Sequence, residues 1–256
     1  MELGLKGKKA VVLGGTRGIG RAIVENLIKE GVNIALCARN PEQVAACIKE
    51  LSGKGVTVIG EAINISNGEA LKSWVCSAGE ELGGIDILIS NASAMTQGSS
   101  EEDWKAGLSI DILGLMNATE AAKPFLEKSA IENGDASIIS IGSVSSVNAS
   151  APSAYGAIKG ALVHYIKGLA KENAAKHIRA NVVSPGTVYF KGGVWHMIEE
   201  NMPDVFAATM KRNPTGRMAT PEDIANATVF LASPLSSFTT GINFIVDGAI
   251  TDRANY

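Results

Sequence analysis

The chain of 256 residues has few cysteines and few histidines, and neither set has the spacing of a metal site. The three cysteines are Cys37, Cys47 and Cys76, and no two of them form a C-x-x-C pair. Three scattered cysteines are typical of reduced thiols in a reducing compartment. We therefore expect no metal site, no disulfide framework and a cytoplasmic location.

An excess of positive charge and long hydrophobic runs are also missing. Lysine and arginine number 23 against 26 acidic residues, and no basic tract occurs, which argues against nucleic acid or an anionic membrane as the main partner. No apolar run approaches the roughly 18 residues of a membrane span. The first ten residues contain no apolar segment of the kind found in secretory signals, so we expect neither a signal nor a membrane span.

Short β-branched stretches alternate with helical patterns along almost the whole chain. The predicted strands are 11–13, 32–36, 56–59, 85–89, 137–141, 180–183 and 242–246. The predicted helices are 18–30, 41–52, 67–82, 101–128, 153–174 and 221–232. Because this alternation buries parallel strands on both faces, it predicts a single α/β domain over residues 1–256. The fold is a Rossmann-like, doubly wound parallel sheet of about seven strands in a three-layer α/β/α arrangement.

The stretch 187–217 interrupts this alternation after the sixth predicted strand. An insertion at the carboxyl end of a strand is typical of a substrate lid. It contains Trp195, Met197, Met202 and Phe206, whose apolar side chains favour an apolar substrate. Packing of the lid on the body or on a neighbouring subunit explains the same residues equally well.

A glycine-rich segment from Gly14 to Gly20 joins the first predicted strand to the first predicted helix. Glycine lets the backbone turn sharply and approach a phosphate, while the helix N-terminus offers free N–H groups. The segment therefore predicts a dinucleotide site. The second predicted strand ends without the acid that would bind the ribose 2′-hydroxyl of NAD. Arg39 stands there instead, and Arg17 lies in the glycine segment, which together predict NADP.

Tyr155 and Lys159 are four residues apart and share one face of a predicted helix. That face continues through Leu162, Ile166 and Leu169, so it must be buried. A lysine at the head of a buried stripe is costly unless its charge is needed there. A neighbouring ammonium can stabilise a tyrosine phenolate, which predicts that Tyr155 is a general acid or base.

Ser143 follows the strand predicted at 137–141 and precedes this helix. Its hydroxyl could bind a substrate oxygen against Tyr155, although Ser140, Ser145 and Ser146 are nearby competitors. No histidine–acid pair accompanies it, so we do not expect a hydrolase nucleophile.

Together these motifs resemble those of the short-chain dehydrogenases/reductases, in particular the NADP-preferring branch, over essentially the whole chain. The matching segments are Gly14-x-x-x-Gly18-x-Gly20, Asn64-Ile65, Asn91-Ala92, Ser143, Tyr155-x-x-x-Lys159, Pro185-Gly186-x-Val188 and Val246-Asp247-Gly248. The resemblance implies that the cofactor is bound by Gly14, Thr16, Arg17, Gly18, Ile19, Gly20, Arg39, Asn64, Ile65, Asn91, Ala92, Tyr155, Lys159, Pro185, Gly186 and Val188. It also implies catalysis by Ser143, Tyr155, Lys159 and Asp111, and substrate contacts from Ser143, Tyr155 and Trp195.

Two residues depart from the pattern of that family. Asp111 occupies the place of a catalytic asparagine, and Phe190 replaces a threonine that normally touches the cofactor. Aspartate can accept the same hydrogen bonds as asparagine but cannot donate any, so we expect Asp111→Asn to change turnover less than about tenfold. We also expect the pH optimum of that variant to move slightly downwards.

The sequence thus predicts an NADP-dependent oxidoreductase, a carbonyl reductase that interconverts a ketone and a secondary alcohol. One alternative is the 3-oxoacyl-[acyl-carrier-protein] reductase of the same family, although that carrier is acidic and no strong basic patch is evident. Another is a non-catalytic protein that senses a dinucleotide, which would need the glycine segment but not both Tyr155 and Lys159. The resemblance further implies a homotetramer in which the helices predicted at 101–128 and 153–174 pair across a two-fold axis.

Overall fold

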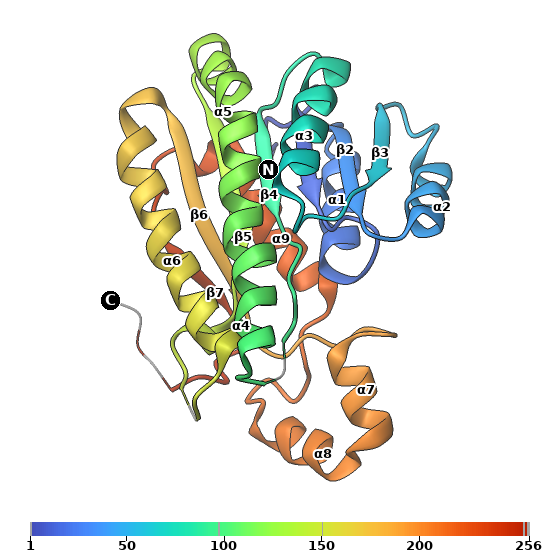
Figure 1. Ribbon diagram of the computed structural model, residues 1–256, viewed down its shortest axis with the longest axis vertical. Helices are drawn as coiled ribbons and strands as arrows, with labels where there is room; N and C mark the ends of the chain where they lie inside the picture. Colours follow the sequence, from blue (N-terminus) through green and yellow to red (C-terminus); the bar gives the residue numbers. More distant parts are fainter. Residues whose placement is uncertain (1, 97, 150, 253, 255–256) are drawn as a thin grey trace.

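The computed structural model describes residues 2–96, 98–149, 151–252 and 254, and within them seven strands form one sheet (Figure 1). The strands are β1 (Lys9–Leu13), β2 (Asn33–Ala38), β3 (Val58–Ala62), β4 (Ile87–Ser90), β5 (Ala136–Ile141), β6 (Ile178–Pro185) and β7 (Asn243–Val246). Their order is β3-β2-β1-β4-β5-β6-β7, and all neighbours are parallel. The predicted doubly wound sheet is confirmed.

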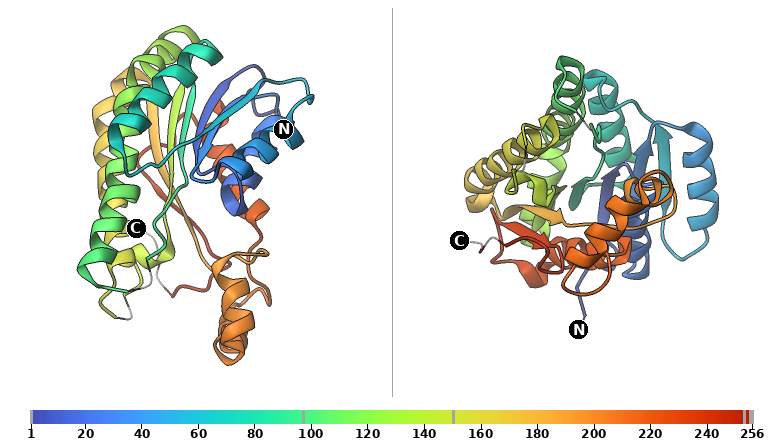
Figure 2. Two further views of the ribbon diagram at one scale, coloured as in Figure 1. Left: turned by 45° about the vertical axis from the view of Figure 1, so that its right-hand side comes forward. Right: turned by 90° about the horizontal axis from the view of Figure 1, so that it is seen from below.

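Helices cover both faces of this sheet (Figure 2). The helices are α1 (Gly18–Lys29), α2 (Pro41–Leu51), α3 (Gly68–Leu82), α4 (Glu101–Gly107), α5 (Gly114–Asn133), α6 (Ala154–Asn173), α7 (Val194–Asn201), α8 (Pro203–Arg212) and α9 (Pro221–Ala232). Shorter turns are the π-helical η1 (Leu108–Leu113) and the 3-10 turns η2 (Val144–Ser146), η3 (Ala174–Lys176) and η4 (Pro234–Ser236). Helices α3, α5 and α6 pack on one face, and α1, α2 and α9 pack on the other.

Alternation along β1 shows why residues 10–13 are all apolar. Val11 and Leu13 belong to the core under α3, α5 and α6, whereas Ala10 and Val12 belong to the core under α1 and α9. Successive side chains of a strand point to opposite faces, so a strand covered on both faces buries every side chain. Strands β3 and β4 each begin two residues later than predicted, and they end three residues and one residue later, respectively.

The helix predicted at 101–128 is a continuous helical run through α4, η1 and α5. It begins at a capping box in which Ser100 and Asp103 exchange hydrogen bonds. The π-helical turn η1 interrupts its regular hydrogen bonding in the middle of the run. Such turns shift the direction of the side chains that follow, and this one carries Asp111.

Helices α7 and α8 form a lobe beyond the carboxyl edge of the sheet (Figures 1 and 2). The two ends of this segment are tied together at its base. Val188 forms a parallel bridge with Ala219, and the Thr187 hydroxyl lies 3.1 Å from Asn213 Oδ1. The segment therefore leaves the body and returns to it at the same place.

Neither a helix suited to a membrane nor a metal-binding cluster occurs in the described part of the chain. No helix there is both long and apolar enough to cross a bilayer. The same residues include no group of three or more histidine, cysteine, aspartate or glutamate side chains that could hold a metal ion.

Candidate active site

The carboxyl ends of parallel strands lie at one edge of the sheet, and the predicted site residues gather along that edge. The glycine segment follows β1, Arg39 follows β2, Asn91 follows β4 and Ser143 follows β5. In a doubly wound sheet, ligands bind at this edge, where the strand order reverses. Here the reversal falls between β1 and β4.

The glycine segment is held in a shape that only glycine permits at its last position. A Cβ atom on Gly20 would lie 2.0 Å from the Gly14 carbonyl oxygen and 2.4 Å from Asn91 Nδ2. Asn91 Nδ2 donates a hydrogen bond of 2.7 Å to the same carbonyl oxygen. Gly14 and Gly18 have φ angles of 80° and 54°, in the left-handed region that favours glycine. Asn91 therefore braces the segment, a role that its place in the sequence did not suggest.

The start of α1 has the features of an anion site. Arg17 is the N-cap residue without a side-chain cap, and the first turn contains no acidic residue. Thr16 precedes the helix and Ile19 lies in its first turn. The free N–H groups and the positive end of the helix dipole are therefore at the end of α1 that follows the glycine segment.

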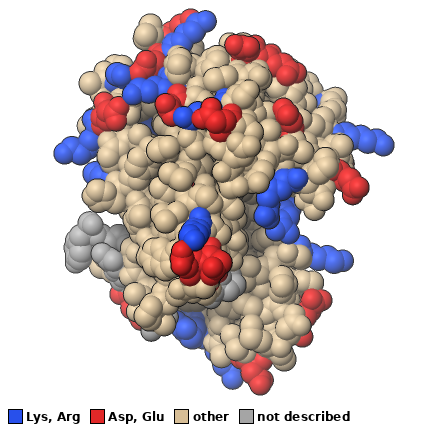
Figure 3. Space-filling model, in the orientation of Figure 1, with Lys and Arg blue, Asp and Glu red and all other residues tan. Residues whose placement is uncertain are grey.

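Two arginines are available near this helix start. Arg17 and Arg39 are exposed, and neither guanidinium forms a hydrogen bond or ion pair with any side chain among the described residues. In Figure 3, basic side chains border the hollow between the body and the lobe of α7 and α8, below α1 and β2. Positive charge is thus present where a 2′-phosphate is expected.

The predicted adenine-side residues are partly engaged in local contacts. Asn64 Oδ1 accepts hydrogen bonds from the backbone N–H and the hydroxyl of Ser66, at 3.2 and 2.8 Å. Ile65 is buried against Gly114, where an added Cβ would lie 2.5 Å from Ile65 Cγ2. Ala92 contacts Gly14. Their role in binding adenine stays a prediction.

The turn after β6 is packed closely against the segment that follows β7. Pro185 and Val246 are the last pair of β6 and β7. The Gly186 N–H extends this pairing by one residue, because it donates a 3.0 Å hydrogen bond to the Val246 carbonyl oxygen. A Cβ on Gly186 would lie 2.8 Å from Asp247 Cβ. Val188 is buried at the base of the α7–α8 segment. The turn therefore joins the site edge to the predicted lid.

Helix α6 brings Tyr155 and Lys159 to the end of β5. The Lys159 ammonium lies 5.7 Å from the centre of the Tyr155 ring, and its Nζ donates a 2.9 Å hydrogen bond to the Ile141 carbonyl oxygen. Lys159 is only 2% exposed, whereas Tyr155 is half-buried. The charge of the lysine is therefore held out of water next to a phenol that can reach a ligand.

Ser143 begins the turn η2, which packs against α6, and the glycine at position 156 permits a close approach. A Cβ on Gly156 would lie 3.0 Å from the Ser145 carbonyl oxygen, whereas one on Gly160 would lie at an ordinary contact distance of 3.5 Å from that of Ser146. Ser143 Oγ accepts the N–H of Ser145 at 3.1 Å and so caps the turn. That bond uses the oxygen and leaves the hydroxyl hydrogen for another acceptor.

Asp111 joins the same constellation from η1. Its Oδ1 forms an ion pair with Lys159 Nζ at 2.9 Å, and the two side chains are 2% and 3% exposed. Its Oδ2 accepts the backbone N–H of Ala94, in the loop after β4, at 2.9 Å. The predicted catalytic residues are thus brought together, and Asp111 is in direct contact with the lysine.

Phe190 makes a contact that the sequence did not predict. Its ring atoms lie 2.5–3.0 Å from the position that a Cβ on Gly18 would take, and 2.8–3.0 Å from that of Gly193. The ring therefore lies between the start of α1 and the start of α7. No pattern in the sequence links these distant positions; the departure from threonine was the one signal.

The predicted substrate residue Trp195 is half-buried on α7. The same lobe has a small aromatic cluster, in which the Tyr189 ring lies 6.1 Å from His196 and 6.0 Å from Phe206. The Tyr189 hydroxyl donates a short hydrogen bond to Glu199, and this bond raises the pKa of Tyr189. No sequence pattern pointed to Tyr189 and Glu199, because the packing of the lobe alone brings them together.

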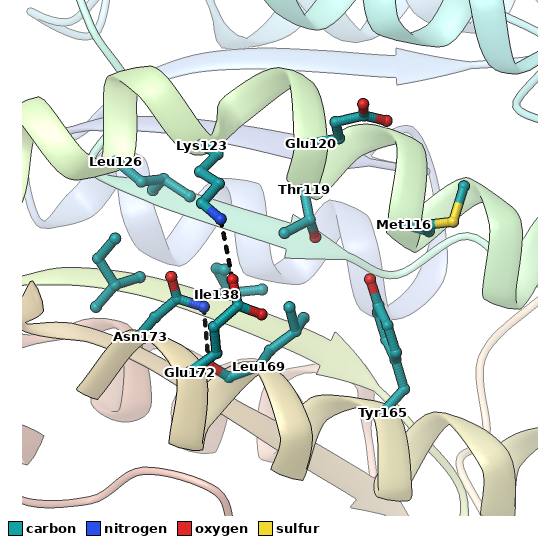
Figure 4. A pocket seen from close by; sticks show the side chains of 11 residues that line it. Met116, Thr119, Glu120, Lys123, Leu126, Ile138, Tyr165, Leu169, Glu172 and Asn173 are labelled. Carbon is teal, nitrogen blue, oxygen red and sulfur yellow. Dashed lines mark hydrogen bonds and ion pairs between the residues drawn. The ribbon is translucent and has the colours of Figure 1, made fainter. Parts of the chain in front are cut away.

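A groove of about 330 Å³ between α5 and α6 lies apart from these residues (Figure 4). Lys123 on α5 and Glu172 on α6 form an ion pair of 3.0 Å across it, and the Tyr165 hydroxyl points into it. None of the predicted site residues lines this groove. It is therefore a feature of the outer helical layer.

Comparison with known proteins identifies relatives over nearly the full length. A family model described as enoyl-(acyl carrier protein) reductase matches residues 14–251. The chain is 37% identical over 255 residues to isoepoxydon dehydrogenase from Penicillium expansum, covering 98% of this chain and 97% of the relative. It is 32% identical over 256 residues to a 3-oxoacyl-[acyl-carrier-protein] reductase from Chlamydia pneumoniae, covering 98% and 100%.

Among solved structures, the chain is similar to L-sorbose reductase from Gluconobacter frateurii, which was crystallised in complex with NADPH and L-sorbose. The TM-score is 0.87 at 29% sequence identity, with 99% of this chain and 100% of that chain covered. The similarity therefore includes the sheet, the site edge and the α7–α8 segment.

Proposed function

The chain belongs to the short-chain dehydrogenase/reductase family, and from this premise we propose that it is an NADP-dependent carbonyl reductase that interconverts a ketone and a secondary alcohol. It is an oxidoreductase, as its relatives named dehydrogenases and reductases are. The observation that carries the proposal is the convergence of Tyr155, Lys159 and Ser143 at the end of β5.

The residues at the site edge fit the cofactor. The glycine segment leaves no room for a Cβ at Gly20, and the first turn of α1 has free N–H groups and no acid, as a pyrophosphate requires. Arg17 and Arg39 would hold the 2′-phosphate, because both are exposed and free of side-chain partners among the described residues. When bound, NADPH supplies the hydride that reduces the carbonyl carbon.

Ser143, Tyr155 and Lys159 each have a separate role in the reduction of the substrate carbonyl group. The Ser143 hydroxyl donates a hydrogen bond to the carbonyl oxygen and fixes its position. Tyr155 transfers its phenolic proton to the same oxygen, which becomes the alcohol. The buried ammonium of Lys159 stabilises the phenolate that remains until a proton returns from solvent. In the oxidative direction, the phenolate accepts the proton of the alcohol.

We assign substrate contacts to Ser143, Tyr155 and Trp195, and we propose that the α7–α8 segment is the lid. Trp195 and the aromatic cluster around Tyr189 favour a small substrate with an apolar surface. The second candidate is a 3-oxoacyl-[acyl-carrier-protein] reductase, which the 32% identical relative favours. A 3-oxoacyl thioester should therefore be included in any substrate screen.

The test is a screen of ketones with NADPH, followed by kinetics of Tyr155→Phe on the best substrate. We expect turnover to fall by about 10²–10⁴-fold while the affinity for NADPH is kept, because only the proton donor is removed. Tyr165→Phe is the matched control, since Tyr165 lies on the same helix but faces the groove between α5 and α6. A Tyr155→Phe enzyme within about tenfold of the wild type would rule out the proposed role.

A further inference from the structure

Both carboxylate oxygens of Asp111 have a partner, and the two partners belong to different elements. Oδ2 accepts the Ala94 N–H at 2.9 Å, and Oδ1 forms an ion pair with Lys159 Nζ at 2.9 Å. Oδ1 accepts no hydrogen bond among the described residues, so its contact with the lysine is one of charge. The lysine in turn donates to the Ile141 carbonyl oxygen at 2.9 Å. One buried carboxylate therefore connects the loop after β4, helix α6 and strand β5.

An asparagine cannot make the same pair of contacts. Its side chain has one accepting oxygen and one NH₂ group, and the NH₂ group can only donate. Whichever way the amide is turned, its NH₂ faces either the Ala94 N–H or the Lys159 ammonium. In the first orientation the buried Ala94 N–H loses its acceptor, and in the second the buried ammonium loses its counter-charge and faces a donor, both of which are costly for buried polar groups. The expectation that Asp111→Asn is mild is therefore revised by the structure.

The charges of Asp111 and Lys159 also favour a carboxylate at this position. Lys159 is 3% exposed in its side chain, and Asp111 is the only acidic side chain that forms an ion pair with it in the described part of the chain. Burial disfavours an unpaired ammonium, so without the carboxylate the charge of Lys159 would be left without a counter-ion. The nearest titratable group on α6 is Tyr155, whose phenolate needs that positive charge.

We propose that Asp111 is a positioning residue that keeps Lys159 charged and in place and, with its second oxygen, holds the loop after β4. The inference rests on the proposed function of Lys159. The ammonium donates one hydrogen bond to the Ile141 carbonyl oxygen and faces the Asp111 carboxylate at 2.9 Å. The side chain is specified as a carboxylate because one short residue must both accept the Ala94 N–H and supply the counter-charge of the ammonium.

The test compares Asp111→Asn with Asp135→Asn as a matched control. Asp135 is also a buried carboxylate in an ion pair, 2.7 Å from Arg179, but it lies at the opposite end of β5. Three quantities are measured for each variant: thermal stability, amide hydrogen exchange at Ala94, and kcat/KM against pH with the best ketone and NADPH.

For Asp111→Asn we expect kcat/KM to fall about tenfold or more, since a buried ammonium loses its counter-charge. The pH profile of kcat/KM should differ from that of the wild type, and Ala94 exchange should become faster because its N–H loses a charged acceptor. For Asp135→Asn we expect lower stability with an unchanged pH profile and unchanged exchange at Ala94. An Asp111→Asn enzyme with the wild-type pH profile, or with the Ala94 amide still protected, would overturn the inference.

A double variant, Asp111→Leu with Lys159→Met, covers the case in which Asp111→Asn does not fold. Replacing both members of a buried pair by apolar residues is often tolerated, so we expect it to fold with a rapidly exchanging Ala94 amide. Slow exchange there would again overturn the inference. The exchange measurement needs no substrate, so it is independent of the proposed reaction. A wild-type protein that reduces no carbonyl compound with NADPH would instead contradict the proposed function.

Discussion

Replacing Arg39 by alanine tests the assignment of the cofactor most directly. Arg39 follows β2 at the edge of the sheet where the adenine ribose of a bound dinucleotide is expected. The guanidinium is exposed and makes no hydrogen bond or ion pair with a side chain of the described residues. Its removal therefore breaks no side-chain hydrogen bond or ion pair among the described residues. A change in cofactor binding then reports the lost contact with the phosphate.

The size of the effect follows from that environment. A hydrogen bond to a charged group contributes about 1.5–3 kcal/mol in general. Solvent around an exposed guanidinium screens the interaction, and Arg17 remains to bind the same phosphate. We therefore expect NADPH binding to weaken about tenfold, at the lower end of the ten- to hundredfold range that one such contact allows. NADH lacks the phosphate and should bind as before.

The assay is the dissociation constant of each cofactor, with kcat/KM for both wherever a ketone substrate is known. Arg21→Ala is the matched control. Arg21 lies on α1 near the glycine segment, but its guanidinium forms ion pairs with Glu25 at 2.7 Å and Glu50 at 2.9 Å. We expect that variant to keep the wild-type ratio of NADPH to NADH affinity. An unchanged ratio in Arg39→Ala, or a change in the affinity for NADH equal to that for NADPH, would refute the assignment.

Three further predictions concern other parts of the molecule. Phe190→Thr should bind NADPH about three- to tenfold more tightly, because the ring no longer covers the start of α1 at Gly18; weaker binding in a calorimetric titration would show that the ring is part of the site. Thiol labelling of the native protein at pH 8 should modify Cys76 alone, because burial raises the pKa of Cys37 to about 12 and also raises that of Cys47; labelling of more than one thiol without unfolding would contradict this. Light scattering should give the molar mass of a tetramer, and a monomer at micromolar concentration would exclude this assembly. In the tetramer we expect α5 and α6 of neighbouring copies to cover the groove of Figure 4.

Local patterns in the sequence were sufficient for the architecture and for much of the site. Strands buried on both faces are mostly apolar along their whole length rather than at alternate positions, and this signal does not depend on which strands are neighbours. The spacing of Tyr155 and Lys159 places them on one helix face wherever that helix lies. The glycine segment likewise specifies a tight turn into a helix, because both the turn and the helix start are formed by consecutive residues.

Contacts between distant segments were decided only by the tertiary structure. The sequence identified Asp111 as a departure but not its two partners, since the positions of the Ala94 N–H and the Lys159 ammonium depend on how η1, α6 and the loop after β4 pack. The contact of Phe190 with Gly18 and the bond from Asn91 to Gly14 are of the same kind. A residue type fixes what a side chain can donate, accept or bury, whereas the packed fold fixes which group it meets.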